Sequence, residues 1–321
     1  ILLQVLWLGF FTSSLLKSYV WLRPLMFIMS SAVVLWLVSK DETSAYKISW
    51  IILILVFPVF GGLLYLSIGN KKPSRVIRKK LQPVLDEIEP VMIMPQDIAY
   101  EMNDGKTHGF TYLSDLGFGT YQNTITKYYS LGDYNYCDLL KDIKNAKHFI
   151  FMEYFIVAEG LMFETILKLL KQKVKECIEV RFIYDDVGSL TTVPYHFEKQ
   201  LEEYGIQCVV FNPFVPIVSV AMNHRDHRKI CVIDGHTAFT GGINLADEYI
   251  NAIDKHGHWK DTALIIKGEA VWSFTVMFLT MWDYLRKTNE DYEAYRPHVH
   301  HPEPFEGAGF VNPYTDCPLD N

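Results

Sequence analysis

A histidine and a lysine two residues apart are the pair of side chains in this chain whose spacing most strongly indicates chemistry. His227, Lys229 and Asp234 stand at H-x-K-x4-D spacing, and a Gly-Gly-Ile-Asn run follows that ends at Asn244. An imidazole can attack a phosphorus atom, and a neighbouring ammonium group can stabilise the charge that develops on the phosphoryl oxygens. The pair therefore predicts chemistry at an anionic phosphoryl group, with His227 as the nucleophile.

The segment that carries this pair is predicted to be a β-strand. The run 228–233 is rich in β-branched residues and is closed by a glycine. Residues i and i+2 of a strand share one face, so His227 and Lys229 are expected to point the same way. A second predicted strand, 237–240, leads into the glycine pair. Those glycines allow a tight turn that would bring the amide of Asn244 back to the same site.

Three carboxylates are candidates for supporting roles. A nucleophilic imidazole needs an acceptor for its other ring nitrogen, and Asp261, which leads into a predicted strand, is the candidate for that acceptor. An exposed loop acid is the alternative interpretation of Asp261. Asp234 belongs to the candidate catalytic set as part of the spacing pattern, but acids commonly cap turns, so its role is interpreted as architectural. Glu153 lies within an apolar predicted strand and is either ion-paired or lines the site.

Two adjacent acids, Asp185 and Asp186, follow a predicted strand on the side where α/β proteins gather their sites. A loop-capping role is an equally good interpretation. A metal pair is not expected there because Lys229 already supplies positive charge. Histidines near the motif are interpreted as surface residues, since nothing in their spacing supports a zinc site. We therefore expect no metal and no cofactor.

The elements that must position these groups alternate between strand and helix. Such alternation predicts an α/β fold with a largely parallel sheet that is covered by helices on both faces. An aromatic helix near the end of the pattern is expected to pack in the core. The predicted strands are 149–157, 178–184, 207–211, 228–233, 237–240 and 263–266, and the predicted helices are 138–145, 162–176, 194–204 and 271–285.

Composition restricts the class of partner. Half of the 321 residues are apolar and the formal net charge is −7. No basic stripe is available to neutralise a nucleic-acid backbone, so no nucleic-acid partner is expected. Apolar blocks at about 1–16, 20–39 and 48–69 predict transmembrane helices within residues 1–70, and the third block is long enough to cross about 30 Å of hydrocarbon. Whether residues 1–16 span the membrane stays open.

The rest of the chain divides into three predicted parts. Residues 71–122 form a basic juxtamembrane segment and linker, residues 123–290 the catalytic domain, and residues 291–321 a turn-rich linker. Positive charge stays on the cytoplasmic side of a membrane, so the catalytic domain is expected in the cytoplasm. The same charges would be attracted to anionic lipids. They are Lys71, Lys72, Arg75, Arg78, Lys79 and Lys80.

The complete strings NHRDHRKICVIDGHTAFTGGINLADEYI and HWKDTALIIKG closely resemble the first half of bacterial cardiolipin synthases, which belong to the phospholipase D superfamily. The resemblance covers nearly the whole chain. It implies a phospholipase D-like α/β fold and a metal-independent phosphatidyl transfer between two phosphatidylglycerol molecules. His227 would form a phosphohistidine, and cardiolipin and glycerol would be the products. Lys229 and Asn244 would hold the phosphoryl oxygens, and Asp261 would orient His227.

The family draws its general acid and base from a second H-x-K-x4-D string, which this sequence does not contain. We therefore expect a fragment that lacks the second catalytic half, and two copies could complete the site as a homodimer. One alternative is a membrane-bound phospholipase D or phosphodiesterase with water as acceptor. Another is a non-catalytic, membrane-anchored remnant that binds anionic lipid. The resemblance implies a multi-pass protein of the bacterial cell membrane.

Overall fold

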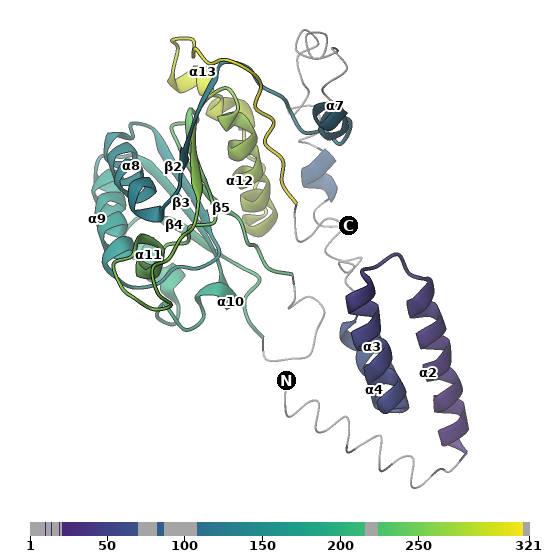
Figure 1. Cartoon of the computed structure of the whole chain (residues 1–321). Coiled ribbons are helices and arrows are strands. Elements are labelled where there is room, and N and C mark those ends of the chain that lie inside the picture. Colours follow the sequence, from purple (N-terminus) through teal and green to yellow (C-terminus); the bar gives the residue numbers. More distant parts are fainter. Residues whose placement is uncertain are drawn as a thin grey trace. The chain divides into compact units, whose positions relative to one another are not determined.

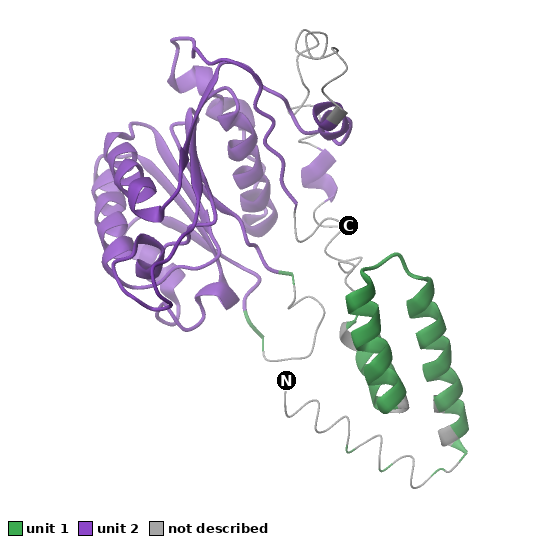
Figure 2. Cartoon of the chain, viewed as in Figure 1, with its two compact units in different colours: residues 1–74, 214–224, 321 green, residues 75–213, 225–320 purple. Residues whose placement is uncertain are grey.

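The computed structural model describes Phe10, Ser14, Tyr19 and residues 21–69, 82–86, 108–215 and 224–316. The chain divides into two compact units (Figure 2). One comprises residues 1–74, 214–224 and 321, and the other comprises residues 75–213 and 225–320. The first unit contains the apolar N-terminal helices, and the second contains a β-sheet and the candidate catalytic residues.

Three apolar helices make up most of the described part of the first unit. Their common core consists of Leu37, Ile54 and Tyr65, each no more than 1% exposed. The indole of Trp50 packs edge-on against the Tyr65 ring, with 5.3 Å between ring centroids. The helices are α2 (Leu22–Ser39), α3 (Ser44–Val56) and α4 (Pro58–Ile68) (Figure 1).

The predicted span 48–69 is not one continuous helix. Phe57 separates α3 from α4, because Pro58 has no backbone N–H and its ring clashes with the preceding turn of an uninterrupted helix. None of the helices in the described part of the chain is both long enough and apolar enough to cross a membrane. The predicted span 1–16 lies outside the described residues, apart from Phe10 and Ser14.

A seven-stranded mixed sheet lies at the centre of the second unit, in the order β1-β7-β6-β5-β2-β3-β4. Only β2–β3 and β3–β4 are parallel, whereas β1–β7, β2–β5, β5–β6 and β6–β7 are antiparallel. The strands are β1 (Thr124–Tyr129), β2 (Phe149–Tyr154), β3 (Glu179–Asp185), β4 (Gln207–Phe211), β5 (Lys229–Ile233), β6 (Thr237–Gly241) and β7 (Ala263–Gly268).

The prediction of a largely parallel sheet is therefore wrong, and the turn after β5 supplies the physical reason. Asp234 and Gly235 both have φ in the left-handed region, at 52° and 68°. This turn reverses the chain within three residues, so β6 returns antiparallel beside β5 without a crossover helix. A Cβ on Gly235 would also collide with the carbonyl oxygen of Tyr295.

Helices cover both faces of the sheet, as the sequence predicts (Figure 1). α8 (Gly132–Asn145), α9 (Leu161–Lys175) and α11 (Phe197–Glu203) contribute to one buried cluster, and α12 (Val271–Arg286) contributes to the other. The expected core role of the aromatic helix is confirmed, since its tryptophans are at most 2% exposed. The remaining described elements are α7 (His108–Asp115), α10 (Asp186–Ser189), η3 (Asp247–Ile250), η4 (Tyr292–Tyr295) and α13 (Pro297–His300).

Two pairs of histidine rings join the segment after α12 to the sheet. The His148 and His300 rings lie 4.4 Å apart, and the His236 and His301 rings lie 5.0 Å apart. Burial lowers the pKa of His236 and of His300, and the neighbouring histidine in each pair lowers it further, against the opposing charge of Asp234. The neutral forms of His236 and His300 are therefore favoured in the folded protein.

Acidification is expected to destabilise this junction. A folded-state pKa below the unfolded value of about 6.5 stabilises the native state above that pH, and the contribution is lost as the pH falls through the folded pKa. We expect the melting temperature to drop from pH 7.5 to pH 5.5, and His300→Gln to reduce that drop. Calorimetry of both proteins, with the exposed His258→Gln as control, measures the difference. Equal drops in all three proteins would contradict the assignment.

Candidate active site

The candidate nucleophile and cation stand at the entry to β5. Lys229 is the first residue of the strand, lies opposite Tyr154 of β2 and is 5% exposed. The His227 ring lies 4.8 Å from the Phe155 ring, and the Nζ atom of Lys229 lies 5.4 Å from the centre of that same ring. Both side chains therefore lie against Phe155, as expected for residues that share one face.

The surroundings of His227 favour its neutral form, although the residue is exposed. Partial desolvation lowers the pKa of His227, and the nearby ammonium group of Lys229 lowers it further, while the carboxylates of Asp226 and Asp185 act in the opposite direction. A neutral imidazole has the free lone pair that nucleophilic attack needs. None of the described residues forms a hydrogen bond to the His227 ring.

The lysine is also tuned by its surroundings. Burial lowers the pKa of Lys229 to about 8, and the carboxylates of Asp226 and Asp261 oppose that shift. Its Nζ atom donates one hydrogen bond, of 2.7 Å, to the main-chain oxygen of His227. An ammonium group has three donors, so two N–H groups remain for an anionic ligand beside the imidazole.

Loss of this charge is expected to limit turnover at high pH. Lys229 is charged below its pKa of about 8, so its attraction for an anionic ligand weakens as the pH rises through that value. We predict a basic limb near pH 8 in the pH–rate profile of the wild-type protein. Lys229→Gln should lower turnover at pH 7 and abolish the limb, whereas Lys260→Gln, at an exposed position nearby, should retain it. A wild-type profile that stays flat from pH 7 to 9 would contradict this role.

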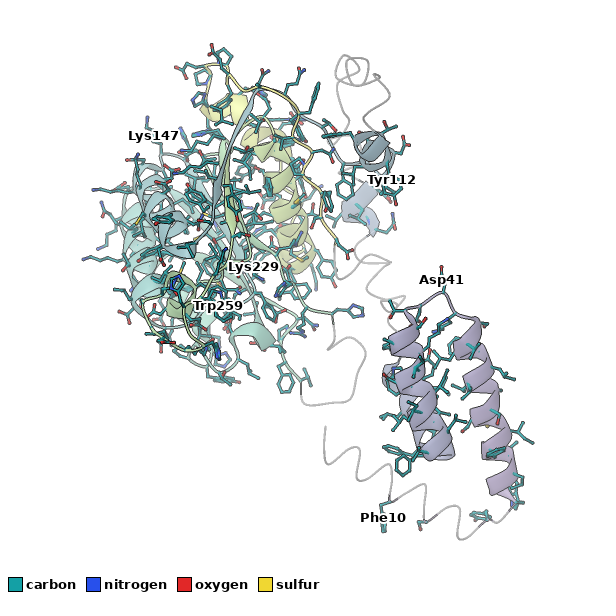
Figure 3. The ribbon with its side chains drawn as sticks, in the orientation of Figure 1. Phe10, Asp41, Tyr112, Lys147, Lys229 and Trp259 are labelled. Atoms are coloured by element: carbon teal, nitrogen blue, oxygen red, sulfur yellow. The ribbon has the colours of Figure 1, made fainter. Side chains whose placement is uncertain are left out.

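Asp234 lies at the opposite end of β5 and binds main-chain groups. Its carboxylate accepts the N–H groups of Lys147, His148 and Phe149 at 2.9, 2.8 and 3.0 Å, and its own N–H donates to the oxygen of Phe149. Figure 3 shows Lys147 and Lys229 at well-separated places in the unit. The structure thus places Asp234 away from His227, in contacts that tie the β5–β6 turn to the start of β2.

Asn244, the candidate phosphoryl ligand, is 2% exposed and has protein partners at both ends of its amide. Its Oδ1 atom accepts the N–H of Ile156 at 3.0 Å, and its Nδ2 atom donates to the hydroxyl of Tyr249 at 2.8 Å. The amide therefore joins the loop after β6 to the loop after β2. One Nδ2 hydrogen is left for a ligand, so the predicted role would use only that donor.

Asp261 lies near the lysine and does not reach the histidine. Its Oδ1 atom accepts the N–H of Thr262 at 2.8 Å, and its charge acts on Lys229. The carboxylate rests directly on Gly242, where any Cβ would collide with it. The expected hydrogen bond between Asp261 and His227 is absent from the described structure, and the acids whose charges act on His227 are Asp226 and Asp185.

Glu153 is ion-paired on the other face of the sheet. It lies opposite Ile230 and shares the face of Phe151, which packs on α12, whereas Lys229 shares the face of Tyr154. Its carboxyl group is fully buried and lies 2.5 Å from Nη2 of Arg228. Of its two sequence interpretations, the structure therefore shows the ion pair. Burial raises the pKa of Glu153 well above its usual range.

Sequence reasoning missed the charged residues that flank the nucleophile. Asp226 is 2% exposed and its Oδ1 atom accepts the Nε–H of Arg228 at 3.1 Å. Arg225 binds Oδ1 of Asp185 at 3.2 Å. The run R-D-H-R-K at residues 225–229 could have indicated these partners. Successive side chains of a strand point to opposite faces of the sheet, and a charged side chain that becomes buried needs an ionic or hydrogen-bonding partner on its face.

Comparison with known proteins identifies the family. Residues 139–282 match the family described as cardiolipin synthase, PLD-like domain, and residues 27–70 match the family described as phospholipase D-nuclease N-terminal. The chain contains the phospholipase D-like domain of the cardiolipin synthase family. The matched domain contains His227 and Lys229, and also the neighbouring charged residues Asp185, Arg225 and Asp226.

Curated relatives cover much of the chain. An uncharacterised protein of Streptococcus mutans is 41% identical over 292 residues, which is 90% of this chain and 63% of that protein. Cardiolipin synthase 2 of Bacillus cereus is 35% identical over 77% of this chain and 49% of its own length. Cardiolipin synthase 1 of Staphylococcus aureus is 31% identical over 78% and 52%. The chain thus spans about half the length of these two cardiolipin synthases and 63% of the length of the uncharacterised relative.

Proposed function

We propose that this protein is a cardiolipin synthase that transfers a phosphatidyl group between two phosphatidylglycerol molecules. The observation that carries the proposal is the imidazole of His227, whose neutral form is favoured, beside the ammonium group of Lys229, both against the Phe155 ring. The relatives named cardiolipin synthase support the lipid substrate and the choice of acceptor. Phospholipase D or phosphodiesterase activity, with water as acceptor, is the alternative with the same first step.

The reaction would proceed in two displacements at phosphorus. A ring nitrogen of His227 forms a bond to phosphorus, and the bond from phosphorus to the glycerol oxygen breaks, so a phosphohistidine and glycerol result. The hydroxyl of a second phosphatidylglycerol then attacks phosphorus and the nitrogen–phosphorus bond breaks, which gives cardiolipin and frees His227. Lys229 would hold a non-bridging oxygen through both steps, and Asn244 would contribute its remaining Nδ2 hydrogen.

The proton transfers need groups that the described site does not supply. A general acid must protonate the leaving glycerol and a base must accept the proton of the second hydroxyl. We propose that a second catalytic half provides them, either from the same natural protein or from a partner copy in a homodimer. We also propose a bacterial cell-membrane location with the catalytic domain in the cytoplasm. The apolar blocks at 1–16, 20–39 and 48–69 and the basic cluster that follows motivate this location.

Lipid turnover by the complete natural gene product tests the proposal. The protein would be assayed in membranes with phosphatidylglycerol that carries separate labels in its headgroup and acyl chains. Cardiolipin with equimolar glycerol is the expected result, and an alkaline quench should retain a phosphorylated peptide that contains His227. If the assay yields phosphatidic acid and no cardiolipin, the protein is a phospholipase and not a synthase. If the protein binds lipid and turns none over, it is a non-catalytic membrane protein.

A further inference from the structure

Two buried acids without a role in the proposed chemistry, Asp185 and Asp226, hold the segment that carries the nucleophile. We propose that both are positioning residues for His227. Asp185 clamps the main chain directly before His227, and the carboxylate of Asp226 supplies the negative charge that balances the His227–Lys229 pair. The proposal rests on the proposed function in one respect, namely that His227 is the reacting group.

Asp185 joins several segments through one carboxylate. It is the last residue of β3, and its side chain is fully buried. Its Oδ2 atom accepts the main-chain N–H of Asp226 at 3.1 Å, and its Oδ1 atom accepts the N–H of Gly188 at 3.0 Å and the Nη1–H of Arg225 at 3.2 Å. The same Nη1 atom donates to the carbonyl of Asn212 at 2.9 Å. The ends of β3 and β4 are thereby tied to the entry of β5.

The Asp185 carboxylate fixes a segment that, in the described part of the chain, has no main-chain hydrogen bonds to a neighbouring strand. The last register pair between β2 and β5 is Tyr154 with Lys229, so His227 lies outside the ladder of main-chain hydrogen bonds. β3 is separated from β5 by β2 in the sheet, and the Asp185 carboxylate reaches past the end of β2 to bind the N–H of Asp226. The main chain before His227 is therefore fixed by a side chain from a strand that is not its neighbour.

Asp226 turns its carboxylate toward the α12 face. Its Oδ1 atom accepts the main-chain N–H of Arg228 at 3.2 Å and the Nε–H at 3.1 Å. The guanidinium of Arg228 also pairs with Glu153. Although burial opposes it, the Arg228 charge and a hydrogen bond with Glu153 lower the pKa of Asp226, while burial raises the pKa of Glu153. Asp226 is thus the more acidic of the two, and its carboxylate stays paired with the Arg228 guanidinium.

The charges that face His227 come from a small set of groups. Lys229 and Asp226 lie on its own segment, Asp185 comes from β3, and the loop after β2 presents only the Phe155 ring. Asp261, before β7, acts on Lys229. Asp226 is the acid that acts on both members of the pair. Without its charge, a proton on His227 would be balanced by Asp185 alone, beside the ammonium group of Lys229.

Chemical modification of His227 tests the proposal without any need for turnover. Diethyl pyrocarbonate reacts with neutral imidazole, so its rate at the His227 peptide, followed by mass spectrometry across pH, reports the pKa of that ring in the complete protein. Asp226→Asn should lower this pKa by about one unit, because an opposite charge nearby favours the charged form. Asp226→Glu, which retains the charge, should restore it. The exposed Asp115→Asn serves as the matched control.

Asp185→Asn should act mainly on geometry. Its amide cannot accept every hydrogen bond that the carboxylate accepts, so the modification rate of neutral His227 should rise several-fold. In an active preparation kcat should fall by about 100-fold, the cost of a displacement near 1 Å, with little change in KM. If Asp185→Asn does not fold, Arg225→Gln can be used instead. It removes the hydrogen bond between Arg225 and Asp185 and should also raise the modification rate of His227.

Unchanged pKa and modification rate of His227 in all folded variants would overturn the proposal. The proposed function fails by a different result, which is wild-type-like turnover by a protein without His227. The pKa and reactivity of His227 can be measured in a protein that turns over no lipid at all. The two failures are therefore distinguishable.

Discussion

His227→Gln in the complete gene product is expected to abolish phosphatidyl transfer, with a loss of at least about 10⁴-fold in kcat. Glutamine is uncharged and comparable in size to the neutral imidazole, but it has no nitrogen lone pair that can attack phosphorus. The effect should exceed that of Lys229→Gln, because the lysine stabilises charge on a phosphoryl group that the histidine must first attack. Cardiolipin and free glycerol from labelled phosphatidylglycerol measure the loss.

His258→Gln is the matched control for this substitution. His258 lies on the exposed loop that precedes β7, so the same chemical change there should leave turnover near the wild-type level. The labelled peptide that contains position 227 should also disappear from alkaline-quenched samples of the first variant alone. Turnover by His227→Gln within tenfold of wild type would remove His227 from the reaction.

Asp234→Ala is expected to have the largest effect on stability, lowering the free energy of unfolding by about 3–5 kcal/mol. Three N–H groups lose a charged acceptor, and a hydrogen bond to a charged group contributes about 1.5–3 kcal/mol. Water can reach part of this site and should limit the loss. Alanine also tolerates the φ of 52° poorly. Urea unfolding of the purified protein measures the change.

Asp234→Asn separates the contributions to that loss. Asparagine tolerates a positive φ and keeps one acceptor oxygen, so it should recover about half of the lost stability. Asp115→Ala, at an exposed position on α7, should change stability by less than about 0.5 kcal/mol. An Asp234→Ala protein with wild-type stability but no turnover would move Asp234 from an architectural role into the chemistry.

Local patterns predicted the elements that carry the candidate site. Strand β4 occupies the predicted residues 207–211, and β5 and β6 begin and end within one residue of prediction. β1 was missed because four of its six residues are exposed, so it lacks the apolar alternation that identifies a strand. The direction of the sheet was missed because it depends on the turn at Asp234, which strand periodicity does not encode.

The candidate site, like the fold, was predictable where it depends on local pattern and unpredictable where it depends on contacts between distant segments. The shared face of His227 and Lys229 follows from strand geometry and could be predicted. Contacts between distant segments could not, because loop paths determine them. Asp261 precedes β7 as predicted and yet lies by the lysine, and Asp185 holds a segment two strands away. The spacing of residues in the sequence therefore identifies the candidate reacting groups. The residues that contact and position them can be identified only once the sheet is assembled.

The pairing of β1 with β7 has a consequence for the order of events during synthesis. Thr124 lies opposite Gly268, so the first strand of the domain has no partner until nearly the whole domain has left the ribosome. Contacts between such distant residues slow folding, because a long loop must close first. The sheet cannot close early, and its unpaired edges stay open to wrong partners until β7 emerges. A chaperone that shields nascent strands should therefore raise the yield of this domain more than a faster rate of translation.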